Sequence, residues 1–182
     1  MFYISDTFNI APDSYNNKLQ EMAYEALNKL NIPFERVVTD EAITMEECVQ
    51  ISNKLNMKMV KTLFLCNRQQ TEFYLFVTTA DKPFRAKNFG KAMGISRVSF
   101  ASSEMLQTML GVKIGAATVF GVLMDKDEKI KVVFDSDVLL EECYGCSDGE
   151  STGYMKLKTS QVFHDFLTYA KHTPVVIQIE EE

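Results

Sequence analysis

The sequence predicts an α+β fold in which helices flank a mixed, mainly antiparallel sheet. Apolar residues recur at helical spacing in several segments, whereas other short runs are rich in Val, Phe and Thr and have strand character. Short polar turns separate consecutive strand candidates, which is typical of hairpins. The chain of 182 residues contains neither a repeat nor a linker-like segment, so we expect one domain over residues 1–182.

The first half of the chain is expected to begin with an amphipathic helix over residues 14–30, with Asp13 or Ser14 as its N-cap. A capping box over residues 44–47 opens a second helix. Residues 60–66 are apolar on both alternating faces, as in a central strand that is covered on two sides. The remaining expectations are a strand over 34–38, a hairpin partner over 71–79, and a second-helix core face of Met45, Cys48, Val49, Ser52 and Leu55.

Glycines and capping residues indicate where helices begin and end in the second half of the chain. Gly94 and Gly111 are each expected to end a helix, and Ser102 or Ser103 to begin the second of these helices. The expected elements are a helix over 86–93, a strand over 98–100, a helix up to 110, a hairpin of strands 118–124 and 129–134, a glycine-rich loop over 143–153, a strand over 154–158, a helix capped by Thr159, and a closing strand over 175–179.

The composition indicates a cytoplasmic protein with free thiols. No apolar run approaches the roughly 20 residues that a membrane helix needs, and the N-terminus lacks the basic and apolar segments of a secretory signal. The four cysteines are therefore expected to stay reduced. The net charge of −6 argues against a protein that coats nucleic acid non-specifically. We expect neither DNA nor a membrane as a partner.

Basic residues nevertheless gather in one stretch of this acidic chain. Between positions 82 and 97 lie five of them and no acid: Lys82, Arg85, Lys87, Lys91 and Arg97. A local basic patch fits a small, positioned phosphate contact better than a long groove. The alternative is an ordinary solvated helix face.

Lys61 stands at the beginning of the apolar run 60–66. Burying an ammonium is costly unless an anion or a set of acceptors meets it, so Lys61 is a candidate functional residue. The alternative is a solvated lysine that blunts the end of a strand.

Three further motifs are candidates for chemistry. The loop from Gly115 to Thr118 is small and uncharged, so it either leaves room for a ligand that its backbone N–H groups can approach or packs tightly. Cys143 and Cys146 have C-x-x-C spacing, but glycine-rich sequence follows them and no second pair completes a metal set. Neither histidine lies in a nucleophile motif. We expect no metal and no cofactor.

The succession of strand and loop motifs resembles the YbaK/ProX family, in particular its free-standing branch, which is similar to the editing domain of prolyl-tRNA synthetase. The resemblance extends from about Tyr15 to the terminal strand. The segments that carry it are Val60-Lys61-Thr62-Leu63-Phe64-Leu65, Tyr74-Leu75-Phe76-Val77, Arg97-Val98-Ser99-Phe100-Ala101-Ser102 and Gly115-Ala116-Ala117-Thr118-Val119-Phe120-Gly121.

The resemblance implies a trans-editing deacylase, an enzyme that hydrolyses the ester between a wrong amino acid and the terminal adenosine of a tRNA, typically alanine on the proline tRNA. It implies that Lys61, which matches the family's strand-start lysine, is the catalytic residue that holds the tRNA 3′ end. The family uses no metal, and the substrate's own ribose hydroxyl is thought to help activate the water. The expected substrate-binding residues are Gly115, Ala116, Ala117, Thr118, Ser151 and Thr152.

The partner implied by the resemblance is the acceptor end of a tRNA, and prolyl-tRNA synthetase is a further candidate partner. The residues expected to meet the phosphates of the tRNA are Lys82, Arg85, Lys87 and Lys91.

The chain departs from the family pattern at three places. The proline of the family's Gly-x-x-x-Pro loop falls at Val119, and a histidine usual before the second helix falls near Thr39. The family's His-Pro-x-x-Asn-Thr motif falls in residues 146–152, which contain neither histidine nor asparagine. These departures keep open an alternative function: a catalytically weakened module that binds a tRNA 3′ end, an aminoacyl group or a synthetase.

Overall fold

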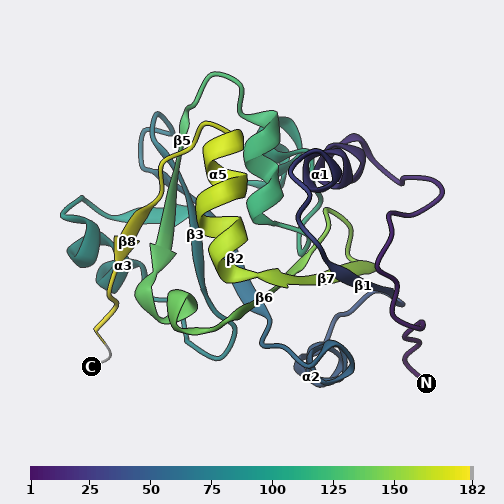
Figure 1. Ribbon diagram of the computed structural model, residues 1–182. Helices are drawn as coiled ribbons and strands as arrows, with labels where there is room; N and C mark the ends of the chain where they lie inside the picture. The colour runs from purple at the N-terminus through teal and green to yellow at the C-terminus, as the bar shows by residue number, and fades with distance from the viewer. Residues whose placement is uncertain (181–182) are drawn as a thin grey trace.

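The computed structural model describes residues 1–180 and contains two β-sheets with helices packed around them (Figure 1). The larger sheet has five strands in the order β4-β2-β3-β5-β8, and the smaller has three in the order β1-β7-β6. The predicted α+β class, with mixed strand directions, is confirmed. The strands are β1 (Glu35–Val38), β2 (Val60–Asn67), β3 (Phe73–Thr79), β4 (Val98–Phe100), β5 (Ile130–Asp135), β6 (Cys143–Ser147), β7 (Gly153–Lys158) and β8 (Val175–Ile177).

Helices cover the larger sheet on both faces. The α-helices are α1 (Lys18–Lys29), α2 (Met45–Leu55), α3 (Ala86–Met93), α4 (Ser103–Met105) and α5 (Leu167–Tyr169). The π-helix η1 (Leu106–Leu110) continues α4, and the π-helix η4 (Gln161–Phe166) precedes α5. The 3-10 helices are η2 (Val119–Met124) and η3 (Ser136–Leu140). No helix within residues 1–180 has the length and apolar character needed to cross a bilayer.

Strand β2 is the central strand that its two apolar faces predict. It pairs antiparallel with β3 on one side and with β4 on the other. Phe64 belongs to the main core, with helix α1 and the η2 segment, whereas Leu65 packs with Phe89 of α3 on the opposite face. The predicted hairpin of β2 and β3 is confirmed, with Lys61 directly opposite Thr78.

The second predicted hairpin is wrong. Residues 119–124 form the 3-10 helix η2, which packs against α1, and β5 pairs in parallel with β3 rather than with residues 118–124. The side chains of Val119, Phe120 and Val122 are all buried. A short run that is buried on every side has no periodicity that separates a strand from a helical turn.

The glycine-rich segment 143–153 is also not the loop that was predicted, because its first half is strand β6, paired with β7. A Cβ on Gly145 would lie 2.4 Å from Met57 Sδ and 2.9 Å from the Lys58 carbonyl oxygen. Gly145 is therefore required where the chain entering β2 crosses β6, and an isolated parallel bridge between Met59 and Gly145 joins the two sheets there.

Helix boundaries agree with the capping signals except at the first and the last helix. Helix α1 begins at Lys18, and its N-cap is Asn17, whose side chain accepts from the Gln20 N–H, rather than Asp13 or Ser14. The capping box of α2, the Ser102 cap and the glycine ends of α3 and η1 are confirmed. Thr159 lies within its helix instead of capping it.

Helix α2 buries the predicted core residue Leu55, but two other predicted core residues are exposed. Its buried residues are Ile51 and Leu55, whereas Met45 and Val49 are 70% and 53% exposed. The helix covers only part of the small sheet, through β1 and β7. An apolar residue on such a helix can therefore face solvent, and hydrophobicity alone does not locate the contact face.

Candidate functional site

The loop from Gly115 to Thr118 lies beside the end of β6. The Ala116 carbonyl accepts a hydrogen bond from Ser147 Oγ at 3.2 Å, and Ala116 is buried. Gly115 is exposed and has a φ of +88°, a left-handed conformation that favours glycine. A Cβ at Gly115 would meet nothing within 4 Å. The space beside this turn is therefore open, as a ligand-facing loop requires.

The same loop contains one buried polar atom without a partner. Thr118 is completely buried, and its Oγ1 has no hydrogen bond in the described part of the chain.

The backbone N–H groups of the loop differ in whether they are already paired. The Ala116 N–H donates to the Lys113 carbonyl, so it is not free for a ligand. Among residues 1–180, the N–H groups of Gly115 and Ala117 have no such backbone acceptor. The Thr118 N–H has no backbone acceptor there either, but Thr118 is completely buried, so Gly115 and Ala117 carry the accessible backbone donors.

Val119 occupies the position where the resemblance places a proline. It is the first residue of the 3-10 helix η2 and is completely buried. Proline suits the first position of a helix because its N–H is not needed there and its φ is already set. Valine keeps the apolar packing at this position but leaves the loop without that backbone restraint.

The turn between β6 and β7 carries Ser151 and Thr152. The Ser151 hydroxyl donates to Glu41 at 3.3 Å, and the Thr152 carbonyl accepts from the Thr39 N–H at 2.9 Å. The structure therefore brings together the two segments in which the resemblance places the family's histidine and its His-Pro-x-x-Asn-Thr motif. The Thr39 hydroxyl donates to the Asp40 carbonyl.

Asp148, in the turn after β6, is a buried polar residue that the sequence did not indicate. It follows Ser147, is 2% exposed, and accepts from the Tyr24 hydroxyl at 2.6 Å and from the Gln20 amide at 3.1 Å. Burial raises the pKa of the Asp148 carboxyl, and the hydrogen bonds from Tyr24 and Gln20 offset only part of that effect. This carboxyl ties the β6–β7 turn to helix α1. Tyr24 and Gln20 are distant in sequence, so no local signal marked the contact.

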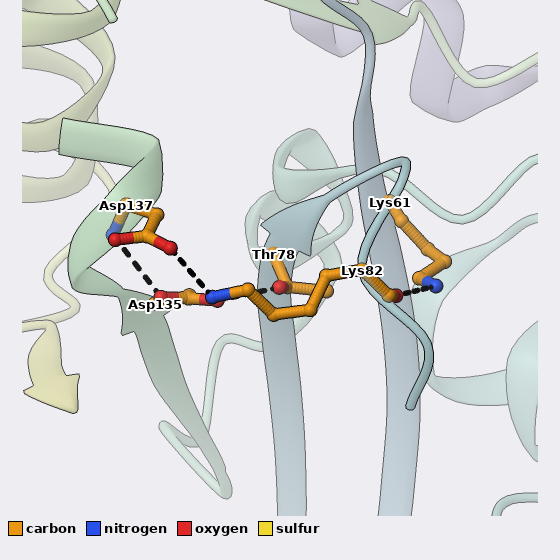
Figure 2. A network of polar contacts seen from close by, with 5 residues as sticks. All are labelled: Lys61, Thr78, Lys82, Asp135 and Asp137. Atoms are coloured by element: carbon orange, nitrogen blue, oxygen red, sulfur yellow. Dashed lines mark hydrogen bonds and ion pairs between the residues drawn. The ribbon is translucent and has the colours of Figure 1, made fainter. Parts of the chain in front are cut away.

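Lys61 is half-buried near the start of β2. Its ammonium donates to the backbone carbonyl of Lys82 (Figure 2). Burial lowers the pKa of Lys61, and the charge of Asp81 opposes that effect. The bridge between Met59 and Gly145 joins the two sheets, and Lys61 comes two residues after Met59. Within residues 1–180 no hydrogen bond links Lys61 to the loop or to the β6–β7 turn.

The expectation that the Lys82 ammonium is free to bind a tRNA phosphate is wrong. It is only 9% exposed, and its ammonium lies 2.6 Å from Asp135 Oδ2 and 2.7 Å from Asp137 Oδ2 (Figure 2). Burial alone would lower the pKa of Lys82, but hydrogen bonds and charge from the two carboxylates outweigh it, and the pKa is raised. A cation that is already paired twice has little left to offer a phosphate.

The rest of the predicted basic patch remains accessible. Arg85, Lys87 and Lys91 are exposed around helix α3, and Lys91 Nζ lies 4.0 Å from a Glu180 carboxylate oxygen, the limit for an ion pair. Such an exposed pair contributes little and would not prevent a phosphate contact.

The C-x-x-C pair lies on strand β6, not at a helix N-terminus. Residues three apart on a strand point to opposite faces. Cys146 is buried, and burial raises the pKa of its thiol, which makes it a poor nucleophile. The geometry therefore differs from that of a thioredoxin-like pair.

The candidate residues are therefore a half-buried cation near the start of a central strand, a small-residue loop whose Gly115 and Ala117 N–H groups lack a backbone acceptor within residues 1–180, and a polar turn after β6. A family model of the aminoacyl-tRNA editing domain matches residues 39–163. The chain therefore belongs to the aminoacyl-tRNA editing domain family, whose members are aminoacyl-tRNA deacylases.

Individual relatives agree with this assignment. The chain is 30% identical over 131 residues to the prolyl-tRNA editing protein ProX of Acetoanaerobium sticklandii, covering 72% of this chain and 80% of the relative. It is 22% identical over 173 residues to prolyl-tRNA synthetase associated domain-containing protein 1 of Danio rerio, covering 94% and 91%. The fold matches a crystal structure of a candidate trans-editing enzyme for prolyl tRNA synthetase, with a TM-score of 0.63, 13% identity, and coverage of 91% of this chain and 100% of that one.

The buried Asp148 carboxyl predicts a specific dependence of stability on pH. Because its folded-state pKa is raised above the unfolded value of about 3.9, the folded state holds this proton more tightly. Its contribution to stability is therefore greatest below about pH 4 and is lost as the pH rises through the folded-state pKa. Asp148→Asn should remove this loss while keeping an acceptor for Tyr24.

We expect the unfolding free energy of Asp148→Asn, relative to the parent, to increase from pH 4 upward and then level off. Urea unfolding at a series of pH values measures this difference. Asp13→Asn, at an exposed carboxyl, is the control and should show no such trend. A constant difference between Asp148→Asn and the parent would contradict the prediction.

Proposed function

We propose that this protein is a deacylase that acts in trans on mischarged tRNA, and that its substrate is the alanyl ester of the proline tRNA. The observation that carries the proposal is the editing-domain match over residues 39–163, which includes the β2 lysine, the Gly115 loop and the β6–β7 turn. The similarity to a protein named for prolyl-tRNA editing supports the choice of tRNA.

In this proposal Lys61 holds the tRNA 3′ end. Its three N–H donors suit a phosphate or sugar oxygen, and one of them is already fixed by the Lys82 carbonyl. Burial lowers its pKa from an ordinary value near 10.5, and a half-buried cation attracts an anion more strongly than a fully solvated one.

Ester hydrolysis at this site needs an oriented water and donors for the oxygen that becomes negative in the transition state. The N–H groups of Gly115 and Ala117 are the proposed donors, because Ala116 is already paired. Preorganised donors of this kind commonly supply several kcal/mol of transition-state stabilisation. The substrate's ribose hydroxyl would orient the water.

Small residues in the loop account for the proposed amino acid. In this proposal the pocket wall is the loop from Gly115 to Thr118, of which Gly115 and Ala117 are accessible while Ala116 and Thr118 are buried, and Ser151 and Thr152 are the proposed contacts from the β6–β7 turn. Synthetases discriminate poorly between small apolar side chains by binding alone, so a second site that admits only the smaller acid adds the missing selectivity. Prolyl-tRNA synthetase, as the source of the error, is the proposed partner in the cytoplasm.

One observation favours the alternative of a binding module with weakened catalysis. The segments where the family has a histidine and an asparagine are joined here through backbone atoms of Thr39 and Thr152, and the Thr39 hydroxyl is used by Asp40. In both functions Lys61 binds the tRNA 3′ end. They differ only in whether the ester is cleaved.

Replacing Lys61 tests the proposed function directly. A charge-assisted hydrogen bond contributes about 1.5–3 kcal/mol, so Lys61→Ala should reduce deacylation of alanyl-tRNA for proline by roughly ten- to a hundred-fold. Lys61→Arg should recover little, because a planar fork cannot replace a compact ammonium in a confined site. Single-turnover hydrolysis measures the rate, and circular dichroism checks the fold.

The control is Lys131→Ala, which removes an exposed lysine from strand β5. If Lys61→Ala deacylates as fast as this control, the assignment of Lys61 fails. If the parent cleaves no mischarged tRNA in a full screen yet binds one through Lys61, the binding module is the correct function.

The accessible basic residues predict a salt effect on binding. Each phosphate contact on a single strand contributes roughly 0.7 to the slope of log affinity against log salt concentration. Replacing Arg85 and Lys87 together by alanine should lower that slope and weaken different tRNAs about equally. Filter binding over a salt series measures this, with Lys18→Ala/Lys29→Ala on helix α1 as the control. An unchanged slope would show that the patch is a solvated face.

A further inference from the structure

Lys82 is held at three points, and one of them is the proposed catalytic lysine. Its N–H donates to the Thr79 carbonyl at 3.1 Å, and its ammonium lies between Asp135 and Asp137. Its carbonyl accepts from the Lys61 ammonium (Figure 2). One residue therefore carries both a buried, paired ammonium and the backbone acceptor of Lys61.

The far end of this chain of contacts is strongly constrained. Asp135 is completely buried at the end of β5, and its carboxylate also accepts from Thr78 Oγ1 at 2.6 Å and from the Asp137 N–H at 3.0 Å. Thr78 is the residue directly opposite Lys61 across the β2–β3 hairpin. The ion pair is thus fixed to the strand pair that also carries Lys61.

Such an arrangement has a physical consequence for Lys61. A lysine ammonium sits on a flexible stem and samples many positions when it is unrestrained. A fixed carbonyl engages one of its three donors and leaves two for a ligand. The ordering of Lys61 then precedes tRNA binding, and a catalytic group held in place before binding gives a faster reaction.

We propose that Lys82 is a positioning residue for Lys61, and that its ion pair with Asp135 and Asp137 sets the position of the Lys61 ammonium at the deacylation site. This inference rests on the proposed function of Lys61. The alternative is an ion pair that only ties the turn after β3 to the end of β5. The two differ in whether loss of the pair reaches Lys61.

The test variant is Lys82→Met with Asp135→Asn. Removing both partners avoids leaving one buried charge uncompensated, which would unfold the region for an unrelated reason. An asparagine at this position keeps an acceptor for Thr78. Asp137 is about half exposed, so its charge remains solvated.

The matched control is His172→Gln with Asp125→Asn. It removes another buried contact, in which the two side chains are 3% and 5% exposed and their atoms 2.8 Å apart. That contact joins the turn after α5 to the turn before β5 and belongs to no proposed site. Thermal unfolding compares the stability losses of the two double variants.

The first measurement is single-turnover deacylation over a range of protein concentrations. We expect the Lys82/Asp135 variant to lower the maximal rate constant by about ten- to a hundred-fold, while the concentration for half-maximal rate changes little. The control variant should keep the parent's rate constant. A rate constant for the Lys82/Asp135 variant equal to that of the control would overturn the proposal.

The second measurement does not depend on activity. In protein with nitrogen-15 lysine, the ammonium resonance of Lys61, assigned from Lys61→Arg, should be distinct in the parent and the control. In the Lys82/Asp135 variant it should move to the position of solvated lysines. If the parent deacylates nothing, the proposed function fails but this measurement still decides the positioning role, and an unmoved Lys61 resonance would refute it.

Discussion

The close crossing at Gly145 is the constraint on which the rest of the structure depends. The chain before β2 passes over β6 where any side chain would collide with Met57 and the Lys58 carbonyl. That approach allows the bridge between Met59 and Gly145, which joins the two sheets. Lys61 on β2 and Ser147 on β6 each follow this bridge by two residues, so the proposed cation and the start of the turn that carries Asp148 belong to the two strands that the crossing joins.

Buried charges fix the parts that this crossing brings together. Asp148 holds the β6–β7 turn against α1 through Tyr24 and Gln20, and Asp135 holds the Lys82 turn against β5. Both carboxyls are nearly inaccessible, so each needs its hydrogen bonds to compensate for lost hydration. These polar contacts therefore anchor the β6–β7 turn and the Lys82 turn, whereas a Cβ at Gly115 would meet nothing within 4 Å. The proposed ester hydrolysis requires only a fixed cation, free N–H groups and an ordered water from this site.

Local signals in the sequence predicted the fold class, the β2–β3 hairpin, the α2 capping box and the glycine ends of α3 and η1, because caps and hairpins depend on residues close in sequence. The η2 helix and strand β6 were not predictable in this way. The run from Val119 to Met124 is buried on all sides, and Gly145 looked like loop sequence because the chain that crosses it is far away in sequence. The proposed roles of Lys61, Gly115 and Ser151 come from the family resemblance and stay predictions. The pairing of Lys82 and the role of Asp148 depend on contacts across more than fifty residues, which no local pattern encodes.

The most direct measurement is an NMR titration with alanyl-adenosine whose ester is replaced by an amide, so that it binds without being cleaved. If the site is correct, the Lys61 ammonium and the backbone amides of Gly115 and Ala117 will shift together and saturate at one ligand concentration. Amides of Ser151 and Thr152 should follow the same curve. Shifts confined to the exposed cations around α3, or a Lys61 resonance that stays unchanged at saturation, would contradict the account.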